Sequence, residues 1–291
     1  MPRKDISFTA SDNVTLRGWL YRPQDAGDSK LPCLVMAHGF WALKEMDLDA
    51  FAAHFVSKLP LSFLVYDNRG FGDNAITYAQ SRPDVDSQKI GVWGNFYSGG
   101  HVLWLGAVDK RVKVVLSQVP CVDGWSTFHR LIRPDFMAGL NQLFEDDRLA
   151  RVAGKPPGML PVVNADVHGP SALPTPDSYE FFTNWAKKSN WKNEVTVKSV
   201  EAFREYNPSA HIHHISPAPL LMTIAQNDVL TPTDIALEAF SRALEPKQLH
   251  ILPGGHFDGY SGPNFEANAG CQTEFLRKHL CSSEMAGYII Y

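Results

Sequence analysis

Short apolar runs that alternate with segments of helical spacing are the feature that most constrains this fold. The expected strands are Cys33–Ala37, Leu61–Tyr66, Lys89–Trp93, Val112–Gln118, Leu220–Ala225 and Gln248–Leu252. Helical segments are expected at Leu48–Leu59 and Ala75–Ser81, from the end of a turn at Gly94–Gly100 to Ala107, and at Asn264–Leu280. Such alternation requires right-handed crossovers between parallel strands. The sequence therefore predicts an α/β fold with a mostly parallel, doubly wound sheet, preceded by a hairpin of Ile6–Ala10 and Val14–Tyr21.

The pattern changes after Pro120, where residues 121–214 show no convincing strand but many aromatic side chains. This stretch is predicted to be a helical lid inserted into the α/β core. The expected organisation is core at 1–120, lid at 121–214 and core again at 215–291. A length of 291 residues suits one domain with such an insertion.

Composition excludes several classes of partner. The net charge of −4 gives no electrostatic basis for binding nucleic acid or anionic membranes. No apolar stretch approaches eighteen residues, and the N-terminus has no secretory pattern, so a cytoplasmic protein is expected. The four cysteines form no CxxC pair, which indicates reduced thiols and neither disulfides nor a zinc site. The histidines within residues 211–214 have no carboxylate at ligand spacing nearby. No bound metal is therefore expected.

The segment around Phe96 has the features of a nucleophile elbow, in which a buried strand turns sharply into a helix. Gly94 precedes the apex, and Ser98 and Gly99 follow it, so the small neighbours that a strained apex needs are present. The apex residue itself is Phe96 instead of a nucleophile. A bulky residue in such a conformation costs about 1–3 kcal/mol, and its ring would lie where an acyl carbon normally sits.

Two polar residues follow the elbow in the chain order of α/β-hydrolases. Asp228 comes after the strand Leu220–Ala225, and His256 comes after Gln248–Leu252. An aspartate bonded to one imidazole nitrogen lets the other nitrogen act as a base. The sequence predicts a His256–Asp228 dyad.

The turn His38-Gly39-Phe40 follows the first parallel strand. In this fold that turn and the residue after the nucleophile supply the backbone donors of an oxyanion hole, so Phe40 and Tyr97 are the expected donors. Ser98 and Cys121 are candidate substitute nucleophiles. The simpler alternative is that Ser98 caps the helix and that Cys121 is a buried, inert thiol. The expected substrate pocket includes His38, Trp125, Phe128 and Trp185.

The chain resembles α/β-hydrolases of the fungal polyketide transferase and trans-acting thioesterase type, related to dienelactone-hydrolase-like enzymes. The motifs are VMAHGFWALKEMDLDAF, YDNRGFGDN, GVWGNFYSGGHVLWLGA, SQVPCVDGW, NDVLTP and GGHFDGY. The resemblance implies polyketide esters or thioesters as substrates. A substrate presented by a carrier protein is compatible with it, so a polyketide synthase is a candidate partner. No cofactor is expected. It also assigns Asp228 and His256 as acid and base, whereas the serine of the family falls on Phe96. The segment from Asp73 to Lys89 is shorter than is usual in the family.

Three functions are compatible with these features. The first is a non-hydrolytic enzyme of polyketide metabolism, in which the dyad removes a proton and the oxyanion hole holds the enolate during cyclisation, isomerisation, elimination or C–C cleavage. The second is a thioesterase or acyltransferase that uses activated water or a substitute nucleophile. The third is a catalytically dead relative that binds a hydrophobic acyl ligand.

Overall fold

The computed structural model describes residues 3–67, 69 and 72–282. Within these residues the main sheet has eight strands in the order β1-β2-β4-β3-β5-β6-β9-β10, and only β1–β2 and β2–β4 pair antiparallel. The strands are β1 (Arg3–Thr9), β2 (Thr15–Tyr21), β3 (Leu31–Ala37), β4 (Ser62–Tyr66), β5 (Val85–Asn95), β6 (Val112–Gln118), β9 (Leu220–Ala225) and β10 (Lys247–Leu252). This arrangement confirms the predicted mostly parallel α/β sheet.

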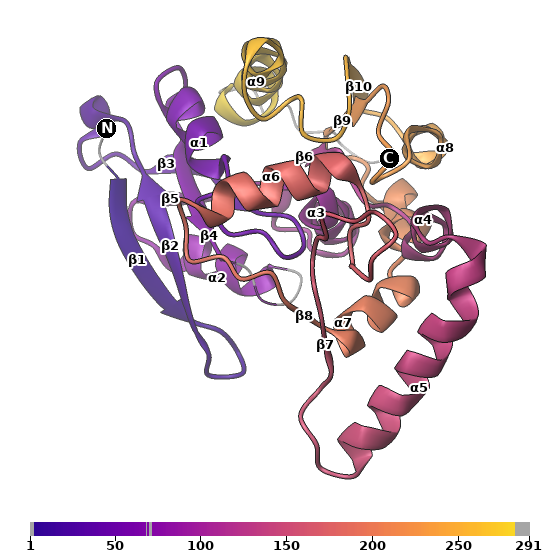
Figure 1. The fold of residues 1–291 in the computed structure, drawn as a ribbon. Coiled ribbons are helices and arrows are strands. Elements are labelled where there is room, and N and C mark those ends of the chain that lie inside the picture. The colour runs from indigo at the N-terminus through magenta and orange to yellow at the C-terminus, as the bar shows by residue number, and fades with distance from the viewer. Residues whose placement is uncertain (1–2, 68, 70–71, 283–291) are drawn as a thin grey trace.

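Helices cover both faces of the sheet (Figure 1). One face packs against α1 (Leu48–Val56) and α9 (Pro263–Leu276). The other packs against α2 (Asp73–Ser81), α3 (Phe96–Val108) and α8 (Thr233–Arg242). Among the described residues, no helix is both long and apolar enough to cross a bilayer.

Several element boundaries differ from the sequence-based expectation. The strand β5 begins at Val85 instead of Lys89, and α1 ends at Val56 instead of Leu59. The predicted turn over Gly94–Gly100 is wrong, because β5 passes directly into α3 between Asn95 and Phe96. One residue with an unusual backbone conformation makes this reversal, so no loop is needed. The helix α8 was not predicted.

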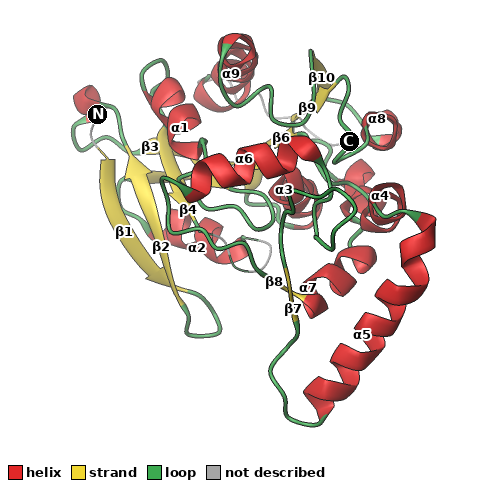
Figure 2. Cartoon of the chain, in the orientation of Figure 1, coloured by secondary structure: helices red, strands yellow, loops and turns green. Residues whose placement is uncertain are grey.

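The segment after β6, predicted to be a lid, is mostly helical (Figure 2). Its helices are α4 (Gly124–Leu131), α5 (Met137–Val152), α6 (Pro176–Ala186) and α7 (Val197–Ala202). Two short strands, β7 (Met159–Leu160) and β8 (Val195–Thr196), pair antiparallel inside it, which the sequence did not indicate. The last turn of the predicted lid, Pro208–His214, belongs with the core, because its Ile212 is fully buried in the cluster that also contains α3 residues.

Buried amide side chains join the C-terminal helix to the middle of the sheet. The Gln118 Oε1 atom accepts hydrogen bonds from Asn268 Nδ2 at 2.9 Å and from Gln272 Nε2 at 2.8 Å. The Gln272 Oε1 atom in turn accepts from the indole of Trp93 at 2.6 Å. Since these side chains are almost completely buried, water cannot replace a lost partner. The network therefore fixes α9 over β5 and β6.

Replacing Gln118 with methionine should remove the acceptor for two buried amide groups while keeping the side-chain volume. We expect Gln118→Met to lower the free energy of unfolding by about 2–4 kcal/mol, because each stranded donor costs roughly 1–3 kcal/mol. Urea unfolding of Gln142→Met, at an exposed position on α5, is the matched control and should change by less than about 0.5 kcal/mol. Equal stability of the two variants would contradict the role of the network.

Candidate active site

The junction of β5 and α3 has the backbone geometry of a nucleophile elbow. Phe96 has a φ of 49°, in the left-handed region that non-glycine residues rarely adopt. Gly94 is needed two residues before it, because a Cβ there would overlap the carbonyl group of Ser98. The Phe96 carbonyl accepts a 2.8 Å hydrogen bond from the amide of Cys121, which ties the turn to the segment after β6.

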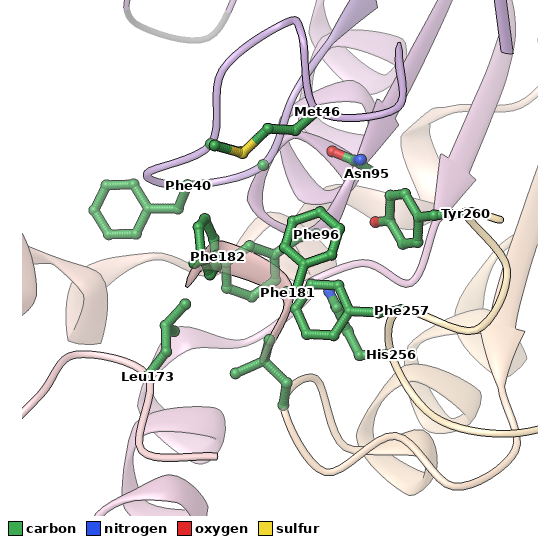
Figure 3. Close-up of a pocket in the computed structure, with 13 residues that line it drawn as sticks. Phe40, Met46, Asn95, Phe96, Leu173, Phe181, Phe182, His256, Phe257 and Tyr260 are labelled. Atoms are coloured by element: carbon green, nitrogen blue, oxygen red, sulfur yellow. The ribbon is translucent and has the colours of Figure 1, made fainter. Parts of the chain in front are cut away.

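The ring of Phe96 lies beside the histidine of the predicted dyad (Figure 3). Its centroid is 5.2 Å from that of the His256 imidazole, and the two rings are perpendicular at 89°. On another side it is packed against Gly39, since a Cβ on Gly39 would lie 2.9 Å from the Phe96 Cδ1 atom. The aromatic ring therefore fills the space between the histidine and the turn after β3.

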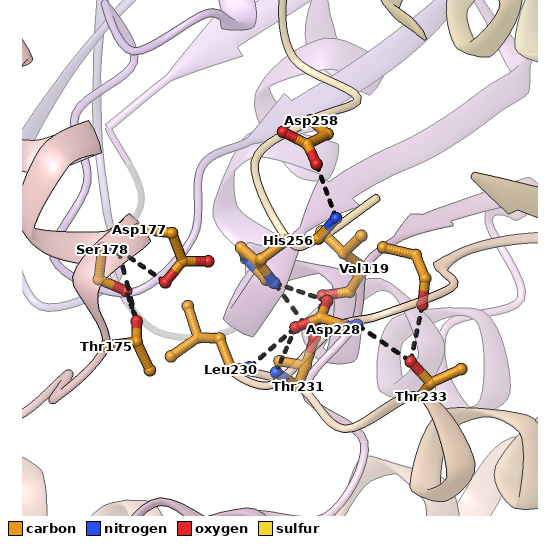
Figure 4. A network of polar contacts seen from close by, with 12 residues as sticks. Val119, Thr175, Asp177, Ser178, Asp228, Leu230, Thr231, Thr233, His256 and Asp258 are labelled. Atoms are coloured by element: carbon orange, nitrogen blue, oxygen red, sulfur yellow. Dashed lines mark hydrogen bonds and ion pairs between the residues drawn. The ribbon is translucent and has the colours of Figure 1, made fainter. Parts of the chain in front are cut away.

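The histidine and aspartate of the predicted dyad meet in a buried contact (Figure 4). The His256 Nδ1 atom is 2.8 Å from Asp228 Oδ2, and the two residues are 2% and 5% exposed. Asp228 Oδ1 accepts from the amides of Leu230 at 2.9 Å and Thr231 at 2.8 Å, and Oδ2 accepts from the Thr231 hydroxyl at 2.9 Å. With Nδ1 donating to the carboxylate, Nε2 is the atom that can accept a proton.

Sequence reasoning missed the threonine in this arrangement. The Thr231 hydroxyl touches Asp228, lies 3.3 Å from His256 Nδ1 and lies 3.1 Å from the carbonyl oxygen of Val119. The signal was available, because Thr231 follows the aspartate by three residues, and a carboxylate can cap a turn at that spacing. Three bonds to one carboxylate hold the aspartate in the orientation that the imidazole needs.

The predicted oxyanion-hole donors, Phe40 and Tyr97, both lie next to the elbow. Tyr97 is the second residue of α3, so its N–H group has no partner within the helix. Among the hydrogen bonds between described residues, neither the Tyr97 amide nor the Phe40 amide acts as a donor. Phe40 and Tyr97 lie side by side in the structure, because their rings stack with centroids 4.6 Å apart.

The cavity beside the dyad is small. Its volume is about 20 Å³, and a cavity of about 10–15 Å³ or more holds one water molecule. The walls are formed by Gly39, Phe40, Ala42, Met46, Asn95, Phe96, Leu173, Phe181, Phe182, Leu230, His256, Phe257 and Tyr260. In this conformation the site accommodates a water molecule but not an acyl group.

The two suggested substitute nucleophiles lie away from this cavity. Ser98 is fully buried, and its hydroxyl donates to the carbonyl of His38 beneath the elbow. Cys121 is also fully buried, and this burial raises the pKa of its thiol well above the usual range. The structure therefore favours the reading of Cys121 as a buried thiol, whereas Ser98 does not cap α3 but ties the elbow to the turn after β3.

None of the four residues expected in the substrate pocket lines the dyad cavity, which corrects that prediction. His38 Nδ1 is 2.8 Å from the Gly39 carbonyl, and its Nε2 is 3.5 Å from a carboxylate oxygen of Asp67. Trp125 is 59% exposed on α4, and Phe128 lines a separate small cavity. Trp185 is partly buried and forms a hydrogen bond with Asp47. The directions of lid side chains depend on tertiary packing, which their spacing does not reveal.

Contacts of aromatic side chains join the predicted lid to the core next to the dyad. Phe181 of α6 stacks on Phe257, the neighbour of His256, with centroids 4.3 Å apart. The indole of Trp191 donates to the Trp41 carbonyl at 2.8 Å, which joins the lid to the loop after β3. The wall of the dyad cavity therefore includes residues from both lid and core.

The lid–core contact at Asp47 should depend on pH. Burial, and then the nearby Asp49, raise the pKa of Asp47 from 3.8 to about 6, although the bond from Trp185 opposes the shift. The folded state therefore binds the proton more tightly, and stability should fall as the pH rises from about 4 to 6.

Asp47→Asn should remove the loss of stability that accompanies ionisation of this carboxyl group. The variant should be more stable than wild type by about 1–2 kcal/mol at pH 7 and nearly equal to it near pH 4. Asparagine also tolerates the φ of 65° at this position. Thermal unfolding across this pH range tests the expectation, with Asp146→Asn on the exposed side of α5 as control. A destabilised Asp47→Asn protein at pH 7 would show that the carboxylate is needed as such.

Comparison with known proteins places this geometry in a family. No family model matches the sequence. Polyketide transferase grgF of Penicillium is 30% identical, covering 96% of this chain and 98% of its own length. Quorum-quenching protein AidA of Acinetobacter baumannii is also 30% identical, covering 94% of each chain. A thiohydrolase of Eupenicillium brefeldianum is 28% identical, covering 95% of this chain and 94% of its own.

Solved structures agree with the sequence comparisons. The α/β-hydrolase GrgF from Penicillium superposes with a TM-score of 0.82 at 27% identity, covering 97% of this chain and all of its own. The structure of DcsB in complex with its substrate analogue gives a TM-score of 0.83 over the same shares at 23% identity, and this likeness concerns the fold. With its parallel sheet, its elbow and its relatives along nearly the whole chain, this protein belongs to the α/β-hydrolase family that includes the polyketide transferases.

Proposed function

We propose that this protein is a non-covalent acid–base enzyme acting on a hydrophobic acyl or polyketide substrate. The observation that carries the proposal is the buried, hydrogen-bonded pair of His256 and Asp228 next to an elbow that bears Phe96. A buried ion pair is a poor source of stability compared with apolar packing. Its orientation by Thr231 fits the task of presenting a basic imidazole nitrogen.

The proposed reaction begins with proton removal from carbon next to a carbonyl group. The Nε2 atom of His256 takes the proton, and Asp228 stabilises the resulting imidazolium. The amides of Phe40 and Tyr97 bind the enolate oxygen. The enolate then attacks an electrophilic carbonyl carbon in cyclisation, takes up a proton at another carbon in isomerisation, or expels a leaving group in elimination. In C–C cleavage His256 instead removes a hydroxyl proton, the bond to the α-carbon breaks, and the same two amides bind the enolate that forms. No step requires a nucleophilic side chain.

Substrate entry requires movement, because the dyad cavity is about 20 Å³ in volume. The Phe96 ring and the lid residue Phe181 are two of the bulky groups that line this cavity and would have to move. A hydrophobic substrate would cover the apolar surfaces that these groups expose when they move apart. Its binding free energy would therefore offset the cost of opening the site. A substrate attached to the carrier protein of a polyketide synthase is consistent with this mode of entry.

Hydrolysis by activated water is a second candidate. The cavity beside His256 has room for about one water molecule. Without a nucleophile, however, a hydrolase-type site retains about 10³–10⁴-fold acceleration over water, below the 10⁶-fold or more typical of enzymes.

A catalytically inactive, acyl-binding relative is a third candidate. A cavity of about 610 Å³ in the lid contrasts with the 20 Å³ beside the dyad, so the larger space for a ligand lies away from the base.

Proton exchange tests the acid–base proposal without knowledge of the natural substrate. In D2O, the wild-type protein should accelerate deuterium incorporation at the α-carbon of a β-ketoacyl N-acetylcysteamine thioester, followed by mass spectrometry. His256→Ala should lose about 10²–10⁴-fold of the acceleration, because it removes the base. His250→Ala is the control, since this histidine lies on β10 outside the dyad cavity. Exchange at the background rate with wild-type protein would refute the proposal and favour the binding role.

Restoring the nucleophile tests whether the remaining site is intact. Phe96→Ser should gain hydrolysis of p-nitrophenyl butyrate and labelling by a fluorophosphonate probe, because the serine would stand at the elbow apex beside His256. Phe96→Ala opens the same space without a nucleophile and should stay unlabelled. Equal activities of the two variants would contradict the elbow assignment.

A further inference from the structure

A large cavity, the lid cavity, lies between α5 and the segment 160–174. Its volume of about 610 Å³ falls within the roughly 300–1,000 Å³ of typical ligand pockets. Most of its wall is apolar, with Leu131, Ile132, Phe136, Leu140, Leu143, Leu160 and Val167 among the residues that line it. Such a wall suits a hydrocarbon chain, since burial of apolar surface supplies the affinity.

A smaller cavity lies between the lid cavity and the dyad cavity and shares wall residues with each. Leu131 and Ile132 line both the lid cavity and a cavity of about 10 Å³. Leu173 lines both that small cavity and the one beside His256. The three spaces therefore follow one another through the lid, with Leu173 between the last two.

A cationic side chain stands at the edge of the lid cavity. Arg133 binds Asp135 through Nε at 3.1 Å and Nη2 at 2.7 Å, and its Nη1 is 2.9 Å from His168 Nδ1. A guanidinium has five N–H groups, so two remain for a ligand beyond these contacts. Its side chain is 51% exposed, and a carboxylate is the partner that its geometry favours.

We propose that the lid cavity binds a medium-chain carboxylic acid, with its carboxylate at Arg133. The chain runs past Leu131 and Ile132 toward Leu173, which acts as a gate to the dyad. This assignment goes beyond the proposed function, because the carboxyl group of this acid lies at Arg133, away from His256, and takes no part in the proposed reaction. Binding itself requires no turnover, so it can be tested separately.

The gate consists of a side chain held on a fixed backbone. The Leu173 amide donates to the Val162 carbonyl at 2.8 Å, and the adjacent Ala172 amide donates to the Pro161 carbonyl at 3.0 Å. The Leu173 side chain is almost fully buried. Shortening it should join the two smaller cavities without moving the segment that carries it.

Calorimetric titration of the full chain with decanoic acid tests the site. Wild-type protein should bind it at micromolar concentration, and Leu140→Trp should weaken binding at least tenfold by filling the cavity. Leu149→Trp on the same helix is the control, because Leu149 is 64% exposed and lies outside the cavity. Absence of binding, or equal loss in both variants, would overturn the assignment.

Two further titrations test the orientation of the chain. Arg133→Gln should lower the affinity for decanoic acid about tenfold. It should leave the affinity for 1-decanol unchanged, since the alcohol carries no charge. Leu173→Ala should strengthen binding of hexadecanoic acid relative to decanoic acid by fivefold or more, and Leu173→Val should act in the same direction if the alanine variant is unstable. Unchanged selectivity in both comparisons would overturn the orientation and the gate. These results do not depend on proton exchange, so failure of the proposed reaction would be recognised separately.

Discussion

The sharp passage from β5 into α3 is the constraint on which the rest of the site depends. It requires a residue at positive φ, and Phe96 adopts 49° there. Such strain persists only where surrounding structure imposes it. Gly94 makes room for the turn, and the bond from the Cys121 amide holds the Phe96 carbonyl. Because the backbone is fixed in this way, the Phe96 side chain must project toward His256, as a nucleophile would.

This projection separates two properties that are joined in a serine hydrolase. The acid–base pair keeps its hydrogen bonds, from Thr231 through Asp228 to His256. The space for an acyl group is filled by a ring, which leaves about 20 Å³. Room for a hydrophobic chain is found further away, in the lid cavity beyond Leu173. This separation is the basis of our proposal that the site transfers protons instead of acyl groups.

The core could be predicted from sequence because its signals are local. Runs such as Leu220–Ala225 are fully buried strands, and the order of elbow, Asp228 and His256 follows from the topology of the sheet. The lid could not be predicted to the same degree. Aromatic residues are abundant there, but whether one faces the dyad, like Phe181, or solvent, like Trp125, is decided by how α4 and α6 pack. Two-residue strands such as β7 leave no periodic signal.

The position of the Phe96 ring can be measured directly in solution. In a protein with selectively labelled phenylalanine and histidine, nuclear Overhauser spectra should connect the ring protons of Phe96 with those of His256, whose centroids are 5.2 Å apart. Cross-peaks that disappear in the spectrum of the Phe96→Ala variant can be assigned to the Phe96 ring. Clear contacts would support a base flanked by an aromatic ring in place of a nucleophile. Their absence from the wild-type spectrum would contradict the account, because the space beside His256 would then be open.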